Sequence, residues 1–386
     1  MAIAYNRDVL RGVAAYVASR PQLRVFFPDN FEPSKLNRLL QSEISGVIVA
    51  SVPPVWKLQD KIAVRGLPAV DISADLEQSK LPRVATDDRA VGQLAANYFI
   101  DRGFKQLVYY GMARRYWSVA RGQGFVHQAR RRGAIVQSFY KDEADGEDLA
   151  GLFPATAAKW LKTVSKPSAI FTGNDQLGAY LVEACQQLRI RVPEDVAILG
   201  VDSDDLYGQI RVPHLSSIRQ DSREIGRQAA EWLERLMHAR KLKVNTLLLP
   251  PAGLVTRLSS DVFGVEDVLV RTALGLVQRQ LHEGPSTKLL VAKLDVSRPT
   301  LERHFLKALG RSPATEIQRL QMEKARQLVL DSDIPIATVA AQTGFSSPRQ
   351  FSTSFRHYFK ETPRTMRKHH RYAPATLGAA MLWPGR

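Results

Sequence analysis

The sequence predicts a two-lobed, doubly wound α/β domain followed by an all-helical domain. Over the first 260 residues, short β-branched runs alternate with longer amphipathic stretches, which is typical of parallel strands covered by helices on both faces of a sheet. From Glu266 onward the strand-like runs stop and every hydrophobic pattern has helical spacing. Within that helical region, the same pattern occurs twice, 50 residues apart.

The composition is that of a globular protein with more than one domain. The chain has 386 residues, of which 45% are hydrophobic and 24% charged, and this length suits two or three domains. A single cysteine, Cys185, excludes an internal disulfide framework and a multi-cysteine zinc site. There is no apolar run of membrane-spanning length, and the N-terminus lacks a secretory pattern, so we expect a cytoplasmic protein.

The α/β region contains more strand–helix units than one small sheet can hold, so we expect two lobes within a domain of residues 1–258 and a linker at 259–265. The expected strands are 23–27, 46–50, 69–73, 107–110, 169–172 and 197–201, and the expected helices are 88–102, 148–164, 175–188 and 221–238. No glycine-rich phosphate loop follows a strand, and no histidine has metal-ligand spacing, so no cofactor or metal is expected.

The repeat in the helical region predicts two helix-turn-helix motifs, at about 287–309 and 336–359, within a domain of residues 266–371. Apolar residues at i, i+4 and i+8 recur from Leu301 and again from Phe351, each preceded by a serine that can cap a helix. A helix at 313–330, about 27 Å long, separates the two motifs by roughly one turn of DNA. The remaining residues, 372–386, are expected to form a loose tail.

Charge distinguishes this helical domain from a plain helical bundle. Residues 265–386 carry 19 Lys and Arg against 10 Asp and Glu, whereas residues 1–264 carry 35 against 28. A dense positive excess at one end favours a polyanionic partner, and together with the two motifs it predicts double-stranded DNA.

Residues 336–367 closely resemble the signature of AraC/XylS-type transcription regulators: Ile-Ala, then Gly-Phe, two spaced phenylalanines, Thr-Pro and a closing arginine. Two positions depart from that pattern, with Lys360 where glycine is usual and Met366 where an aromatic residue is usual. Both lie outside the second helix of the motif, so they concern the packing of the last helix more than DNA binding.

The resemblance implies that the N-terminal face of each second helix reads base edges. Its residue types suit that role, because arginine pairs with guanine, glutamine with adenine and glutamate with cytosine. The candidate base contacts are Arg298, Pro299, Glu302, Arg303, Arg349, Gln350 and Thr353. The candidate phosphate contacts are Lys307, Arg311, Arg356, Lys360, Arg364, Arg367 and Lys368.

The α/β region resembles the sugar-binding domains of lactose-repressor-type regulators and periplasmic binding proteins. The resemblance covers nearly all of residues 1–258 and rests on the segments 84–88, 121–125, 172–176, 192–196, 200–202 and 215–218. It implies a chain that crosses three times between two lobes, with a ligand in the cleft. The family normally begins with a strand before the segment that starts at Ala4, so we expect the first strand to be truncated.

Several polar and aromatic side chains suit a neutral polyol, which charged groups bind through hydroxyls and an aromatic ring covers. Asp175 and Asp202 follow strand ends, where open α/β sheets place ligands. By resemblance, Arg121 is a sugar contact. Further candidates are Asn174 and Asp87 for hydrogen bonds, and Trp117 or Tyr5 for ring stacking.

The order of the two domains implies a transcription activator rather than an enzyme. The implied effector is a monosaccharide, with D-xylose favoured, and the implied partners are promoter DNA, a second copy in a homodimer and RNA polymerase. Two alternatives stay open. The regulator could respond to another small molecule, or its first domain could serve only for dimerisation.

Overall fold

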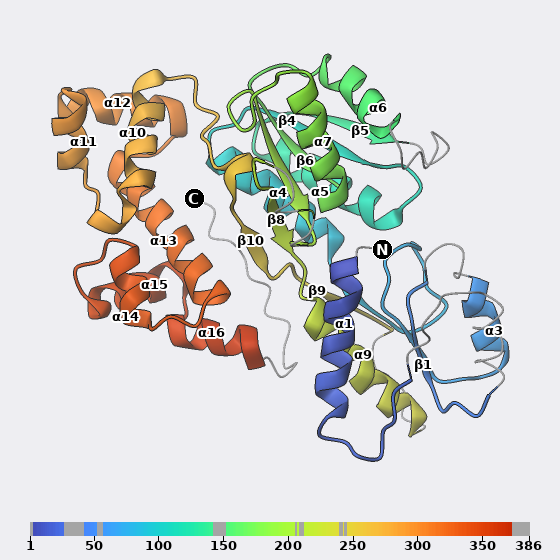
Figure 1. The fold of residues 1–386 in the computed structure, drawn as a ribbon. Coiled ribbons are helices and arrows are strands. Elements are labelled where there is room, and N and C mark those ends of the chain that lie inside the picture. The colour runs from blue at the N-terminus through green and yellow to red at the C-terminus, as the bar shows by residue number, and fades with distance from the viewer. Residues whose placement is uncertain are drawn as a thin grey trace. The chain divides into compact units, whose positions relative to one another are not determined.

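The computed structural model describes residues 3–26, 42–51, 57–141, 152–204, 207, 212–238, 242 and 245–372. These residues form two compact units, Met1–Val265 and Glu266–Arg386 (Figure 1). The predicted fold classes, a two-lobed α/β domain and a helical domain with two helix-turn-helix motifs, are confirmed. No helix in the described residues is long and apolar enough to cross a membrane.

Unit 1 contains two sheets, and we call each sheet with its helices a lobe. Lobe 1 has a sheet of order β1-β2-β3-β9 with parallel pairing throughout. Its elements are α1 (Ile3–Val17), β1 (Val47–Val49), α3 (Leu58–Val64), β2 (Ala69–Asp71), β3 (Arg83–Thr86), α9 (Ser222–Met237) and β9 (Thr246–Leu249).

Lobe 2 has a sheet of order β10-β8-β7-β6-β4-β5, in which the pair β10–β8 is antiparallel and the others are parallel. Its elements are α4 (Asp88–Asp101), β4 (Gln106–Met112), α5 (Tyr116–Arg131), β5 (Ile135–Lys141), α6 (Leu152–Leu161), β6 (Ser168–Thr172), α7 (Asp175–Gln187), β7 (Val196–Val201), β8 (Ser216–Arg219), β10 (Gly253–Val255) and the 3₁₀ turn η3 (Leu258–Ser260).

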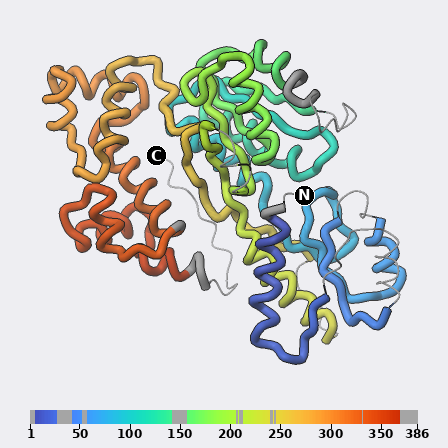
Figure 2. The backbone as a smooth tube through the Cα atoms, viewed as in Figure 1, coloured from blue at the N-terminus to red at the C-terminus, as the bar shows by residue number. Residues whose placement is uncertain are grey.

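The chain crosses between the lobes three times, from β3 to α4, from β8 to α9 and from β9 to β10, as Figure 2 allows the reader to follow. The crossovers are hydrogen-bonded to one another through the backbone. The N–H of Asp87 donates to the carbonyl of Leu249 over 2.7 Å, and the N–H of Ala252 donates to the carbonyl of Arg219 over 2.9 Å. Three joined crossovers form a hinge about which two lobes can rotate.

Helices α4 and α5 pack unusually closely in lobe 2, and glycine makes this possible. A Cβ atom at Gly92 would lie 2.0 Å from the carbonyl oxygen of Arg121, and one at Gly124 would lie 2.1 Å from the carbonyl oxygen of Arg89. This contact explains why residue 124, three residues after Arg121, is a glycine. It also brings the side chain of Arg121 beside the start of α4. Phe99, Phe125 and the strands beneath form the core under both helices.

Several expected elements differ from the structure. Leu23–Phe26 is not part of a strand, because β-branched and aromatic residues favour a strand only where a neighbouring strand accepts their hydrogen bonds; residue 27 lies outside the described residues. The first described element is α1, and the expectation of a truncated first strand stays a prediction. Residues 148–151 and all but the first residue of the expected tail at 372–386 also lie outside the described residues.

The expectation of a linker at 259–265 was wrong. Ser259 and Ser260 are fully buried in unit 1, and Phe263 and Val265 are buried as well. The hydroxyl of Ser259 donates to the carbonyl of Ile198 over 2.7 Å, which joins η3 to the central strand β7. The polar residues of this segment suggested that it is exposed to solvent, but its serine hydroxyl groups form hydrogen bonds with backbone groups inside the domain.

Unit 2 is helical throughout its described residues, 266–372, and repeats one arrangement. Its elements are α10 (Val268–Arg279), the 3₁₀ turn η4 (Leu281–Glu283), α11 (Thr287–Leu294), α12 (Arg298–Leu309), α13 (Pro313–Asp331), α14 (Ile336–Gln342), α15 (Pro348–Phe359) and α16 (Pro363–Tyr372). Residues 301–310 and 351–360 have the same succession of buried, half-buried and exposed positions, so the sequence repeat is also a repeat in packing.

Candidate functional site

A cavity of about 350 Å³ lies between the two lobes of unit 1, at the carboxyl ends of their strands. This is the size and the place in which α/β sheets bind small molecules. Its lining comes from both lobes and from the crossovers: Tyr5, Ser73, Ala74, Asp75, Ala85, Thr86, Asp88, Met112, Arg115, Trp117, Arg121, Asn174, Asp175, Gln176, Asp202, Asp204, Tyr207 and Gln220.

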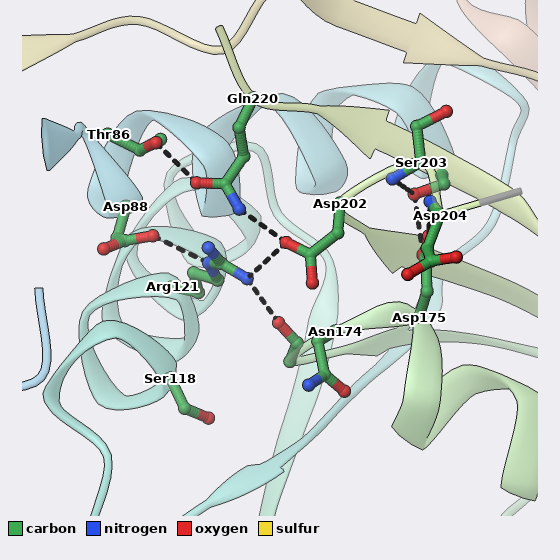
Figure 3. A network of polar contacts seen from close by, with 12 residues as sticks. Thr86, Asp88, Ser118, Arg121, Asn174, Asp175, Asp202, Ser203, Asp204 and Gln220 are labelled. Carbon is green, nitrogen blue, oxygen red and sulfur yellow. Dashed lines mark hydrogen bonds and ion pairs between the residues drawn. The ribbon is translucent and has the colours of Figure 1, made fainter. Parts of the chain in front are cut away.

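Arg121 is the central cation of this cavity. Its Nε donates to Oδ1 of Asp88 over 2.7 Å, and its Nη1 donates to the carbonyl of Gly173 over 2.6 Å. The same Nη1 lies 4.0 Å from Oδ1 of Asp202 (Figure 3). The guanidinium group is thus fixed on one side by helix α4 and on the other by the strand ends β6 and β7, in a geometry suited to charge-assisted hydrogen bonds.

Asp202 is held in a backbone conformation that an aspartate rarely adopts, with φ at 110°. Its carboxylate accepts a hydrogen bond from the amide of Gln220, and the carbonyl oxygen of that amide accepts one from the hydroxyl of Thr86. Thr86 and Gln220 stand at the first and second crossovers. Strain of this kind is maintained where the position of a side chain matters, which supports a binding role for Asp202.

Asp175 lies deeper and is fully enclosed. Its carboxylate accepts from the hydroxyl of Ser217 over 2.6 Å and from the N–H of Asp204 over 2.8 Å. A Cβ atom at Gly200 would lie 2.1 Å from this carboxylate, so the glycine of the Gly200–Asp202 segment makes room for Asp175. With both oxygens bonded inside the protein, Asp175 supports the loop that carries Asp204 more than it reaches a ligand.

Burial raises the pKa of three carboxyl groups in the cavity, those of Asp88, Asp175 and Asp202. For Asp88 and Asp202 the pKa is raised to about 6 by burial, and the charge of Arg121 opposes this effect. For Asp175 burial and the nearby charge of Asp202 raise the pKa well above its usual value. At neutral pH, Asp88 and Asp202 are therefore ionised for the most part but close to protonation.

Three aromatic residues line the cavity: Tyr5, Trp117 and Tyr207. The ring of Trp117 lies over the guanidinium group of Arg121, at 4.8 Å, and so shields it from water on one face. Tyr5 contributes its ring from lobe 1, and its hydroxyl donates to the carbonyl of Ile72 over 2.8 Å. Either of these two rings has an apolar face that a sugar can cover.

The structure therefore brings six of the seven predicted sugar-binding residues to one cavity: Tyr5, Trp117, Arg121, Asn174, Asp175 and Asp202. Asn174 also caps α7, because its side chain accepts from the N–H of Leu177 over 2.9 Å. Asp87 does not line the cavity, contrary to expectation. Its carboxylate caps α4 by accepting from the N–H of Ala90 over 2.9 Å, and the next residue, Asp88, faces the cavity instead.

Sequence reasoning missed Asp88 and Gln220. Gln220 directly follows strand β8, so the same strand-end rule that selected Asp175 and Asp202 also applies to it. For Asp88 the sequence offers two adjacent aspartates, and only the start of helix α4 decides which one caps and which one points inward.

The cavity combines five carboxyl groups with two guanidinium groups, those of Arg115 and Arg121. Such a lining repels phosphorylated or acidic ligands and offers both donors and acceptors to the hydroxyls of a neutral polyol. Among the described residues there is no group of three or more His, Cys, Asp or Glu side chains arranged to hold a metal ion.

In unit 2, α12 and α15 are the second helices of the two motifs. Each is capped as expected: the hydroxyl of Ser297 accepts from the N–H of Thr300 over 3.3 Å, and that of Ser347 accepts from the N–H of Gln350 over 3.2 Å. Leu301 and Phe305 in α12, and Phe351 and Phe355 in α15, are buried. The opposite face of each helix remains open for contact.

The candidate base contacts lie on these open faces: Arg298, Pro299, Arg303, Arg349, Gln350 and Thr353 are exposed, and Glu302 is half-buried. Some of them contact one another. Arg298 donates from Nε to Glu302 over 2.9 Å, and the hydroxyl of Ser346 donates to the side-chain oxygen of Gln350 over 2.7 Å, which leaves the amide nitrogen of Gln350 as the donor for a base.

Five of the seven candidate phosphate contacts are exposed: Lys307, Arg356, Lys360, Arg364 and Lys368. The other two serve the fold instead. Arg311 donates to the fully buried carboxylate of Glu316. Arg367 donates to the carbonyls of Val329 and Ile334, over 3.1 and 2.9 Å, where α13 ends and leaves backbone acceptors without helical partners.

Comparison with known proteins finds two family models along the chain. The periplasmic binding protein-like domain matches residues 96–260, and a helix-turn-helix domain matches residues 290–369. These two matches fall in unit 1 and unit 2 respectively.

Some relatives match almost the whole chain. A xylose operon regulatory protein of Haemophilus influenzae is 25% identical over 373 residues, which cover 94% of this chain and 95% of the relative. The solved structure of a xylose-binding transcription activator superposes with a TM-score of 0.60 at 23% identity and covers 94% of each chain. A LacI family transcriptional regulator from Enterococcus faecium, with bound ribose, matches 67% of this chain and 94% of its own with a TM-score of 0.54 at 18% identity.

Proposed function

We propose that this chain, a DNA-binding, sugar-responsive transcription regulator homologous to the xylose operon regulatory proteins, takes D-xylose as its effector and activates genes for the use of that sugar. It binds its effector without transforming it. As a promoter-binding protein it acts in the cytoplasm, where chromosomal DNA lies.

The arrangement around Arg121 carries this proposal. In one cavity the guanidinium group bonds to Asp88, lies 4.0 Å from Asp202 and is covered by Trp117. A pentose hydroxyl inserted between Arg121 and Asp202 accepts from the first and donates to the second. Because the carboxyl groups outnumber the guanidinium groups, the cavity favours the neutral sugar over its phosphate ester.

Occupation of the cavity changes DNA binding through the hinge. Thr86 and Gln220 connect two crossovers with Asp202, so a ligand on Asp202 acts at the point about which the lobes rotate. The ligand shifts the population of lobe arrangements and thereby the presentation of α12 and α15. We further propose a homodimer that binds paired sites beside RNA polymerase, because helix-turn-helix dimers read paired half-sites.

The test is a calorimetric titration of the full chain with D-xylose, L-arabinose, D-ribose, D-glucose and D-xylose 5-phosphate. It is paired with a DNA-binding titration on promoter fragments with and without the sugar that binds. We expect one saturable site for D-xylose, no binding of the phosphate ester, and a change in DNA affinity only when D-xylose is present.

If a different sugar binds, that sugar replaces D-xylose as the proposed effector, and the proposal of a sugar-responsive regulator stands. If no sugar binds and sedimentation shows a dimer that truncation to residues 266–386 abolishes, the first domain serves for dimerisation instead. Turnover of a bound sugar, measured by chromatography of the ligand after incubation, would contradict the proposal that the chain is not an enzyme.

A further inference from the structure

We propose that Asp75 and Arg115 form a latch between the two lobes that closes the cavity over its ligand and sets the affinity for it. The inference rests on the proposed function of the cavity, and it concerns two residues that neither the strand-end rule nor the family motifs selected. Asp75 belongs to lobe 1 and follows strand β2, whereas Arg115 belongs to lobe 2 and directly precedes helix α5.

The geometry places this pair across the cavity. Nη1 of Arg115 lies 3.5 Å from Oδ2 of Asp75, and both residues line the cavity together with Trp117 and Arg121. The Asp75 side chain is 7% exposed and that of Arg115 is 23% exposed, so solvent screens this pair less than a surface ion pair. The pair joins the two lobes across the cavity.

Arg115 occupies a position that helix formation alone disfavours. It is the N-cap of α5, yet its side chain makes no capping hydrogen bond. A cation at a helix N-terminus also opposes the helix dipole, and serine, threonine, aspartate and asparagine are the residues preferred there. An arginine at this position therefore serves a purpose outside the helix, and the carboxylate of lobe 1 supplies one.

Asp75 also acts on the cavity electrostatically. Burial raises the pKa of Asp88, Arg121 lowers it, and the charge of Asp75 contributes to raising it. Arg115 compensates the charge of Asp75 and so limits the repulsion between the carboxylates of lobe 1 and lobe 2. The pair therefore favours closure, because without Arg115 the charge of Asp75 adds more repulsion to the carboxylates on the other side of the cavity.

Charge reversal tests the latch. We expect Asp75→Arg and Arg115→Asp each to weaken sugar binding about tenfold, and the double variant that carries both changes to recover most of that loss. The matched control is the ion pair between Arg132 and Asp101, at 2.8 Å, which lies wholly within lobe 2. Neutralising it with Arg132→Gln should leave sugar affinity within twofold of the original chain.

A second measurement needs no ligand. Fluorophores on Val64→Cys in lobe 1 and Ile135→Cys in lobe 2 report the distance between lobes, because both positions are exposed whereas Cys185 is buried. In the ligand-free protein, Arg115→Asp should lower energy transfer, and the double charge reversal should restore it. Raised salt should lower transfer in the original chain and not in Arg115→Asp.

The outcomes separate the latch from the proposed function. If D-xylose binds and single reversals leave its affinity and the energy transfer unchanged, the latch is wrong and the effector site stands. If no sugar binds but reversal changes energy transfer and the double variant restores it, the latch stands and the effector assignment fails. If the double variant recovers neither the sugar affinity nor the energy transfer, the latch is wrong.

Discussion

Arg121 and Asp88 form a buried ion pair, 2.7 Å from nitrogen to oxygen, between two helices that pack without room for a Cβ atom at Gly92 or Gly124. Each side chain is 5% exposed. The two glycines thus fix a charge pair at the wall of the cavity. The close packing of α4 on α5 therefore supports both the core of lobe 2 and the binding site.

The first prediction separates Asp88 from its neighbour Asp87. Asp88→Asn leaves the guanidinium group of Arg121 without its nearest counter-charge and removes a carboxylate from the cavity, so we expect loss of sugar binding. Asp87→Ala removes only the cap of α4, so we expect a loss of about 1 kcal/mol in the free energy of unfolding and unchanged sugar affinity. Chemical denaturation and calorimetry measure the two effects. Equal effects of both variants on sugar binding would contradict the assignment of Asp88 to the cavity.

The second prediction concerns pH. Burial raises the pKa of Asp88 and Asp202 to about 6, above the value in the unfolded chain, so protonation of these groups favours the folded state. Their stabilising contribution is full below about pH 4 and is lost as the pH rises through 6. Ligand binding has the opposite dependence, because ionised carboxylates accept hydroxyl hydrogen bonds. We expect sugar affinity to fall several-fold between about pH 7.5 and about pH 5.5.

The control for this pH effect is Asp202→Asn, which removes one of the two titrating groups. The pH dependence of the remaining affinity should be shallower than in the original chain, as measured by titration calorimetry in buffers of matched ionic strength. A wild-type affinity that stays constant across this range would show that the two carboxylates do not contact the ligand in ionised form.

The sequence was sufficient for the architecture and for most of the cavity, and the reasons for its failures are local. Strand ends select Asp175 and Asp202 because parallel strands share one carboxyl edge. The choice between Asp87 and Asp88 depends on which residue begins α4, and a one-residue difference in helix start decides it. The buried serines of η3 resemble linker residues because their hydrogen-bond partners, such as Ile198, are distant in sequence.

In unit 2, too, the sequence was sufficient for the architecture but not for the role of each side chain. Its repeat is evident from spacing, since Phe305 and Phe355 occupy equivalent buried positions. The roles of its arginines are not evident from spacing. Arg311 and Arg364 were both candidate phosphate contacts, but one donates to buried Glu316 and the other is exposed. Only the three-dimensional neighbours distinguish an arginine that supports the fold from one that is open to a phosphate.

The third prediction concerns the two helix ends that follow α12 and α15. Gly310 ends α12 with φ at 70°, and Lys360 ends α15 with φ at 62°. Only glycine adopts this left-handed conformation without steric cost, so we expect Lys360→Gly to raise the free energy of unfolding of unit 2 by about 1 kcal/mol. Gly310→Ala should lower it by a similar amount. Thermal denaturation of the full chain, followed by the transition of unit 2, measures both.

Lys360→Gly also tests a phosphate contact. If the lysine contacts DNA, its removal should reduce the slope of log affinity against log salt by about 0.9, even though the fold becomes more stable. Lys307→Ala is the comparison in the first motif, because Lys307 is also an exposed candidate phosphate contact. Its removal should reduce the salt slope in the same way, but without a favourable change in the backbone. An unchanged salt slope in Lys360→Gly would leave this residue with a structural role only.

The last prediction distinguishes reading of bases from positioning on the backbone. Arg349 is exposed in the first turn of α15, where a helix in the major groove meets base edges, whereas Arg356 is exposed in its last turn. We expect Arg349→Ala to reduce the preference for the cognate base by about 1–3 kcal/mol and to change nonspecific affinity little. Arg356→Ala should weaken binding equally on all sequences, because phosphate contacts carry no sequence information. Binding titrations on the operator and on single-base variants measure both effects, and a uniform loss in Arg349→Ala would place that side chain on the DNA backbone.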